Sequence, residues 1–183
     1  MYTENSYTTP GTYTWTAPVG ITRVRVAVCG GGGTGCNFPG EDWGGNSRYY
    51  IEDDGDPSSF NGVSATGGTA GDYSSGKTIE GETETPYCWY ERGKGGTPNG
   101  KNNNTGFALS FTASNGNYGK GGYGGSLNTV GDSGGYNSTY VNVTAGKSYK
   151  VVVGSGGVPG RSRNLTGYKG TSGFVLIAYG EGI

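Results

Sequence analysis

The sequence contains no histidine in its 183 residues, and this absence decides how its most conspicuous string is interpreted. Residues 131–135 are GDSGG, the string that surrounds the nucleophile of trypsin-like serine proteases. That chemistry needs a base beside the serine, which in those enzymes is a histidine. Ser133 also begins no S-x-x-K string that would supply a lysine instead. We therefore expect Ser133 to be structural, in a glycine thread or turn before a strand at 138.

An excess of charge of either sign is also lacking. The chain has 13 Lys and Arg against 14 Asp and Glu, a net charge of −1. A nucleic-acid-binding domain needs a basic surface that neutralises phosphates, so no nucleic-acid partner is expected. No apolar run reaches the length of a membrane span, so membrane insertion is not expected. Residues 1–15 lack the basic and apolar regions of a signal peptide, so we expect either export by another route or a fragment of a longer chain.

Aliphatic residues and cysteines are few. Hydrophobic residues make up 31% of the chain, whereas glycine alone accounts for 41 residues. Aromatic residues nevertheless reach 13%, and disordered chains usually lack aromatics and carry a high net charge. We therefore expect one folded domain over 1–183. Cys36 and Cys88 could meet, but free thiols are favoured for them and Cys29, and neither a metal site nor a cofactor is predicted.

Alternation of apolar and polar residues predicts an all-β fold, because no stretch shows a convincing helical period. The segment 172–180 is apolar on both faces and should be a buried central strand. Residues 138–154 are interpreted as a hairpin with the turn TAGK. The other predicted strands are 12–16, 21–29, 58–66 and 107–113.

Glycine runs follow the predicted strands at 30–33, 66–71, 119–125 and 154–157. A linker that leaves the middle of a core would abandon its backbone groups without partners. Extended threads of the polyproline II type have three residues per turn and no internal hydrogen bonds, so glycine threads can lie side by side and bond to one another. We predict such ordered threads, and expect a bulky residue at Gly31 or Gly122 to prevent folding.

These pieces, in this order, resemble a known family. The strings that carry the resemblance are GTYTWTAP, ITRVRVAVCGGGG, SSF with SATGG, VNVTAGKSYKVVVGSGG and GTSGFVLIAYG. Through them the chain is similar to the glycine-rich C-terminal domain of phage tail fibres and adhesins, and to related tips of bacterial surface fibres. The resemblance covers both ends of the chain. It implies a β-sandwich with polyglycine II-like elements, placed extracellularly at the distal end of a fibre shaft, that binds a cell-surface receptor. The matching motifs are scaffold, so no binding residues are carried over from the family.

The sequence between these pieces differs in character and predicts inserted loops at about 37–56 and 72–106. They hold two of the three tryptophans and several tyrosines and arginines. Amphipathic aromatics on loops of a rigid scaffold are typical of binding surfaces, although such residues also form small cores beneath long loops. The predicted ligand-binding residues are Trp43, Arg48, Tyr49, Tyr50, Tyr73, Tyr87, Trp89, Tyr90 and Arg92.

Acidic residues suggest two further hypotheses. Asp53, Asp54 and Asp56 offer oxygen ligands of the kind calcium takes, but their spacing does not complete an EF-hand loop. Two carboxylates such as Asp54 and Glu82 could serve a glycosidase, although nothing in the sequence pairs them.

The function predicted from the sequence is a non-enzymatic fibre tip. It would recognise a glycan or an outer-membrane protein on a bacterial host or prey cell through its aromatic loops. A surface-polysaccharide hydrolase and a purely structural fibre component are the alternatives. A homotrimer is expected, since fibre tips follow the symmetry of their shafts, with the loops at the end far from residue 1.

Overall fold

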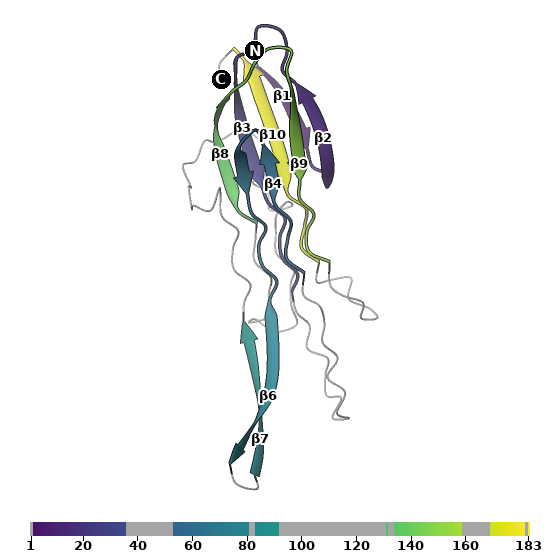
Figure 1. Cartoon of the computed structure of the whole chain (residues 1–183), viewed down its shortest axis with the longest axis vertical. Helices are drawn as coiled ribbons and strands as arrows, with labels where there is room; N and C mark the ends of the chain where they lie inside the picture. Colours follow the sequence, from purple (N-terminus) through teal and green to yellow (C-terminus); the bar gives the residue numbers. More distant parts are fainter. Residues whose placement is uncertain are drawn as a thin grey trace.

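The computed structural model of the chain describes residues 2–35, 53–80, 83–91, 131, 134–158, 169–181 and 183. For 72–80 and 83–91 it gives the course of the backbone and the strand register. These residues form strands joined by turns and extended segments, with no helix among them, so the predicted all-β class is confirmed. Two four-stranded antiparallel sheets lie face to face, and a two-stranded ribbon lies at the far end of the molecule from the chain termini (Figure 1).

The first sheet has the order β1-β10-β3-β8. Its central strand β10 pairs with β1 from Tyr2↔Gly180 and with β3 from Phe174↔Cys29. The predicted central strand at 172–180 is therefore confirmed, whereas β1 was not predicted. The four strands are β1 (Tyr2–Tyr7), β10 (Phe174–Gly180), β3 (Arg23–Cys29) and β8 (Tyr136–Asn142).

The second sheet has the order β2-β9-β4-β5. The predicted strand over 58–66 is in fact two strands joined by a two-residue turn. Asn61 and Gly62 have φ angles of 41° and 83°, the positive values that a tight hairpin turn requires at both central positions. The four strands are β2 (Gly11–Thr16), β9 (Ser148–Val153), β4 (Ser58–Phe60) and β5 (Val63–Ala65).

The prediction of a hairpin over 138–154 is wrong, because β8 and β9 belong to different sheets. The residues between them cross from one sheet to the other. The Val143 N–H donates to the Thr22 carbonyl, and the Gly146 N–H donates to the Ala17 carbonyl. Val141 of β8 and Val143 just after it pack in the same core as Val151 and Val153 of β9, and this core lies between the two sheets, an arrangement that a hairpin within a single sheet would not give.

Aromatic rings make up for the scarcity of aliphatic residues in this core. Trp15 is 5% exposed and its ring lies 5.7 Å from Phe60, 6.1 Å from Tyr149 and 5.8 Å from Tyr179. The Trp15 Nε1–H donates to Asn5 Oδ1 at 3.0 Å, so the indole is both packed and hydrogen-bonded. Inward-facing valines of both sheets surround this group, including Val24, Val26, Val28, Val151 and Val175, each completely buried.

The outer face of the first sheet is apolar as well. Ala27, Phe174 and Leu176 form a second buried cluster there, against which Tyr136 packs. Leu176 has no exposed surface in the single chain. The strand at 172–180 is therefore buried on both faces without a second copy of the chain, so this face offers no support for the predicted trimer.

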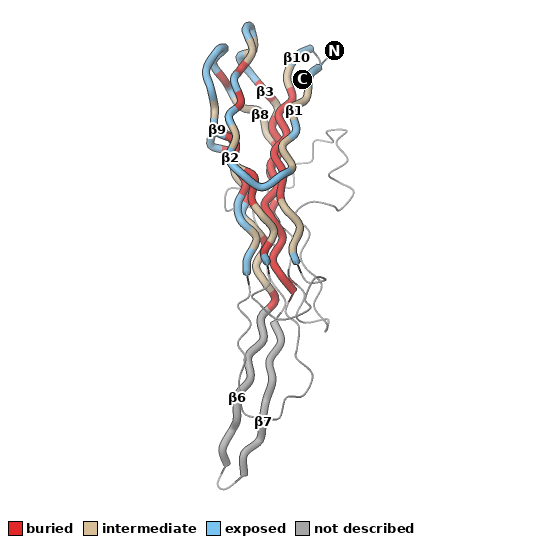
Figure 2. Tube along the Cα trace, turned by 90° about the vertical axis from the view of Figure 1, so that its right-hand side faces the viewer, coloured by how far each residue is buried: buried red, intermediate tan, exposed pale blue. Residues whose placement is uncertain are grey.

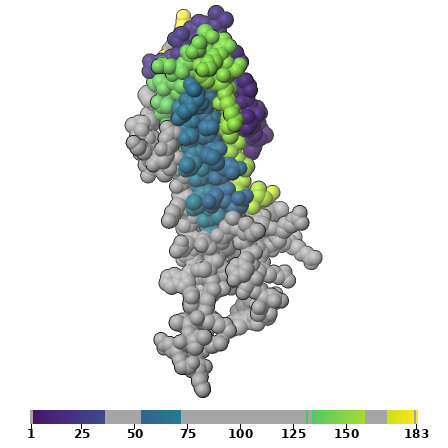
Figure 3. Space-filling view, viewed as in Figure 1, coloured from purple at the N-terminus to yellow at the C-terminus, as the bar shows by residue number. Residues whose placement is uncertain are grey.

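Glycine-rich segments continue six of the strands at the end of the sandwich away from the termini. Buried backbone runs from the strands into these segments (Figure 2), and residues 30–35 are buried throughout. The space-filling view shows residues 53–72, in blue, packed closely beside β9 and the residues that follow it (Figure 3). The glycine-rich segments are 30–35, 53–57, 66–71, 131 with 134–135, 154–158 and 169–173.

Backbone hydrogen bonds of 2.8–3.1 Å join these segments to one another. The segment 30–35 lies in the middle. The N–H groups of Gly30, Gly31 and Gly32 donate to three different neighbours, at Gly135, Asp56 and Thr171. Thr34, three residues after Gly31, donates again to the 53–57 segment, at Asp53. The bond to the 53–57 segment therefore recurs after three residues.

The segments pack too closely for side chains at their contact positions. A Cβ atom built at Gly31, Gly55 or Gly170 would lie within 3.0 Å of backbone atoms of a neighbouring segment. None of these three glycines has a positive φ, so their conformation alone would accept another residue. Glycine is needed there because of backbone proximity. Gly122 lies outside the described residues, so the structure bears on this prediction only at Gly31.

Candidate functional site

The described residues that flank the insertions lie at one end of the molecule. The termini lie together at the other end, where Tyr2 pairs with Gly180 (Figure 1). The segments 30–35, 66–71 and 154–158 lead away from the sandwich, and 53–57, 134–135 and 169–173 lead back to it. We call the end they share the distal end. Its described boundary residues are Gly35, Asp53, Gly71, Gly131, Val158 and Lys169.

The acidic residues at the distal end hold neighbouring segments together. Asp54 Oδ1 accepts from the Ala70 N–H at 2.8 Å, and Asp53 Oδ2 accepts from the Val158 N–H at 3.0 Å. Asp56 Oδ2 accepts a short hydrogen bond from the Ser155 hydroxyl. Each carboxylate thus binds a donor on an adjacent segment, and among the described residues no cluster of metal-ligand type is found. This role in fixing the segments was missed from the sequence.

Part of the predicted insertion at 72–106 is a regular ribbon rather than a loop. Strands β6 (Asp72–Glu80) and β7 (Thr83–Glu91) pair over nine positions and continue directly from the segment 66–71. Four predicted binding residues lie on this ribbon. Tyr73 pairs with Tyr90, Trp89 with Ser74, and Tyr87 with Gly76. A signal was present in the threonines and aromatics of 83–90, which favour strands.

The remaining predicted binding residues, Trp43, Arg48, Tyr49, Tyr50 and Arg92, lie outside the described residues. So do Cys36, Glu82, Ser133 and the predicted strand at 107–113.

Features typical of catalysis are lacking in the described part of the chain. The thiol of Cys29 is buried and unpaired with another cysteine, and burial raises its pKa to about 12, which makes it a poor nucleophile. An S-x-x-K string occurs at 74–77, but Ser74 and Lys77 are three apart on β6. Positions an odd number apart fall on opposite faces of a strand, so this lysine is not placed to activate this serine.

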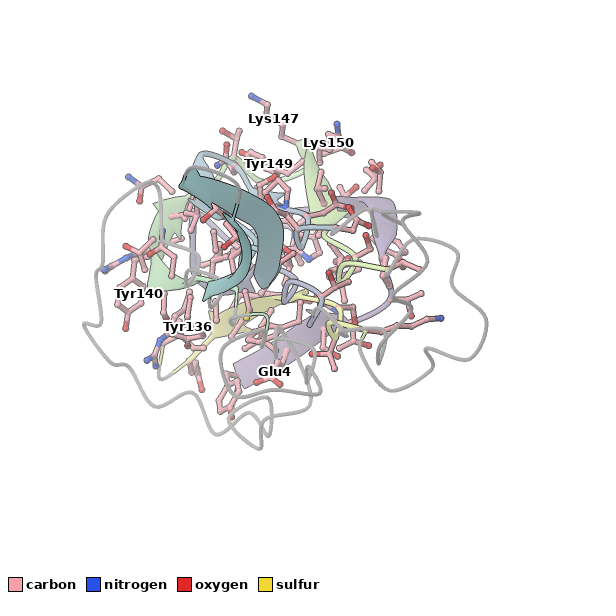
Figure 4. All side chains as sticks on the ribbon, turned by 90° about the horizontal axis from the view of Figure 1, so that it is seen from below. Glu4, Tyr136, Tyr140, Lys147, Tyr149 and Lys150 are labelled. Atoms are coloured by element: carbon pink, nitrogen blue, oxygen red, sulfur yellow. The ribbon has the colours of Figure 1, made fainter. Side chains whose placement is uncertain are left out.

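The sandwich itself gathers no binding cluster. Figure 4 looks along the long axis and shows Lys147, Tyr149 and Lys150 on one side, and Tyr136 and Tyr140 on another. The Arg23 guanidinium lies 4.0 Å from the centre of the Tyr140 ring, so this pair is engaged within the sheet. An open, shallow hollow beside β2 and β9 is lined by Thr12, Asp56, Val152 and their neighbours, and Asp56 is already hydrogen-bonded there.

No family model matches the chain, and no significant similarity to a curated protein or to a solved structure was found. Within the described residues, no helix is long and apolar enough to cross a membrane. The candidate site is therefore defined by geometry alone, as the distal end with the β6–β7 ribbon.

Proposed function

We propose that the chain is a non-enzymatic, receptor-binding fibre tip that uses its distal end to recognise a cell surface. The observation that carries this proposal is the separation of the two ends. Both termini lie at one end, and the aromatic ribbon extends from the other (Figure 1). Attachment through the termini would leave the distal end free to meet a receptor.

The glycine-rich segments are, in this proposal, a polyglycine II-type bundle. The support is the pattern of hydrogen bonds, in which Gly30, Gly31 and Gly32 donate to three separate neighbours and Thr34 repeats the bond of Gly31. A helix with three residues per turn directs its donors in this way. Such a bundle gives the distal end a rigid base, because each segment is bonded to several others along its length.

The proposal places the binding surface on aromatic residues. Tyr73, Tyr87, Trp89 and Tyr90 lie within the nine-pair ribbon, and Trp43, Arg48, Tyr49, Tyr50 and Arg92 are proposed to join them from the neighbouring insertions. Tyrosine, tryptophan and arginine supply most of the binding energy at recognition surfaces, because they offer large contact areas together with polar groups. The fibre shaft, the extracellular location and the homotrimer belong to the same proposal.

Binding of the labelled chain to a panel of bacterial cells tests the proposal. We expect Trp89→Ala and Trp43→Ala to weaken binding while the melting temperature stays unchanged. Tyr2→Ala is the matched control, because Tyr2 is an exposed aromatic at the opposite end. A chain that binds no cell in the panel would favour a purely structural fibre component. Release of sugar products from bacterial polysaccharides would establish the hydrolase.

A further inference from the structure

The two faces of the β6–β7 ribbon differ sharply in composition. Side chains alternate between the faces of a strand, and directly paired residues share a face. The register therefore assigns each position to one of two faces. One face, which we call the apolar face, carries Tyr73, Ile79, Pro86, Cys88 and Tyr90 together with Ser75, Lys77 and Glu84. The other, which we call the Trp89 face, carries Tyr87, Trp89 and Gly76, and its remaining seven positions are hydroxyl or carboxyl residues.

The two aromatics of the Trp89 face are paired with small residues. Tyr87 and Trp89 are two positions apart on β7, opposite Gly76 and Ser74. Positions two apart on a strand are separated by about 6.6 Å. This arrangement places two aromatic positions in a row along one strand, opposite a glycine and a serine on the other strand.

We infer that the Trp89 face binds an oligosaccharide of a bacterial surface, an inference that rests on the proposed receptor-binding function. Sugar rings stack their C–H faces on indole and phenol rings, and their hydroxyls donate to carboxylates and exchange hydrogen bonds with serine and threonine. Threonines at 78, 83 and 85 and acidic residues at 72, 80 and 91 share this face with the two aromatics. The row of two aromatic positions suits consecutive rings of a chain rather than one monosaccharide.

The size of the ribbon favours a glycan over a protein. Nine residues in a strand extend about 30 Å, and two strands about 4.8 Å apart present a face about 10 Å wide. The resulting footprint of about 300 Å² is well below the roughly 800 Å² that each partner contributes to a standard protein interface. An extended oligosaccharide fits a narrow face of this kind.

Treatment of the target cells separates a glycan from a protein receptor. Periodate cleaves the vicinal diols of sugars, whereas protease removes exposed protein. We expect binding of the whole chain to survive protease and to be lost after periodate. The opposite result overturns the glycan while leaving the receptor-binding function intact, and a chain that binds no untreated cell in the panel overturns both.

Variants of the two faces test the assignment on immobilised lipopolysaccharides, capsular polysaccharides and peptidoglycan fragments. We expect Trp89→Ala and Tyr87→Ala to weaken binding at least about tenfold, equivalent to about 1.4 kcal/mol, and Trp89→Phe to retain most of it. Tyr73→Ala and Tyr90→Ala are the matched controls on the apolar face, and should bind as the parent does. Equal losses on both faces, or full binding by Trp89→Ala, would overturn the inference.

Discussion

Replacing Gly31 with alanine should destabilise the protein far more than a single added methyl group normally does. The Cβ atom would overlap the carbonyl group of Ser155, which is backbone and cannot rotate away. The Gly31 N–H donates to the Asp56 carbonyl and its own carbonyl accepts from the Gly68 N–H, both at 2.9 Å. Segment 30–35 therefore cannot shift without losing these two bonds.

The alternative is to displace the segment 154–158. That segment is held by the bond from the Asp56 N–H to the Ser155 carbonyl and by the bond from the Gly157 N–H to the Gly32 carbonyl. Either movement breaks two hydrogen bonds, which at about 1 kcal/mol for each bond costs about 2 kcal/mol. Domains of this kind are stable by only about 5–15 kcal/mol, so the variant should fold but lose a substantial part of its stability.

Thermal unfolding followed by circular dichroism measures this effect. For a chain of this length, about 2 kcal/mol corresponds to a fall in melting temperature of about 4–8 °C. Gly20→Ala is the matched control, because Gly20 has no neighbour within 4 Å but a φ of +82°. Its cost is the backbone strain alone, about 1–2 kcal/mol. A melting temperature of Gly31→Ala within 2 °C of the parent would refute the close packing of the segments.

Three further predictions concern two buried residues of the sandwich and the oligomeric state of the chain. Burial raises the pKa of Cys29 from 9.0 to about 12. The stability that the neutral thiol contributes is therefore complete below pH 9 and declines as the pH rises toward 12. Over that range the melting temperature of Cys29→Ala should fall less steeply than that of the parent protein. Phe60→Ala, which leaves a cavity beside Trp15, should lower the free energy of unfolding by about 3–5 kcal/mol in denaturant titration; a loss under 1 kcal/mol would contradict the assignment of this ring to the core. Light scattering decides the predicted trimer, since a mass near 18.8 kDa means a monomer.

Strands with an unambiguous one-sided or two-sided apolar pattern were predictable from the sequence. The alternating valines of 24–28 and the continuous apolar run of β10 each leave one packing solution. The strand β1 was not recognised because Tyr2–Tyr7 is mostly polar and serves as an edge. The crossing between β8 and β9 was missed because a turn sequence does not tell whether the strands it joins pair with each other or face each other across a core.

The candidate site was predictable in part. Its location away from the strands follows from the positions of the insertions, but the pairing of Tyr73 with Tyr90 and of Trp89 with Ser74 depends on a register that no local pattern fixes. The aspartates at 53, 54 and 56 bind segments that are distant in the sequence, such as the one at Ala70. Those partners depend on the three-dimensional arrangement of the segments, so the sequence alone could not identify this structural role.

Amide hydrogen exchange at the glycine-rich segments tests the central claim most directly, namely that an ordered bundle positions the distal end. Nuclear magnetic resonance of the glycine-labelled chain reports on Gly30, Gly31, Gly32 and Gly157, whose N–H groups all donate to neighbouring segments. The account predicts that these amides exchange about as slowly as those of the central strand β10. Exchange at the rate of an unstructured chain, with β10 still protected, would show that the segments are linkers and would contradict the account.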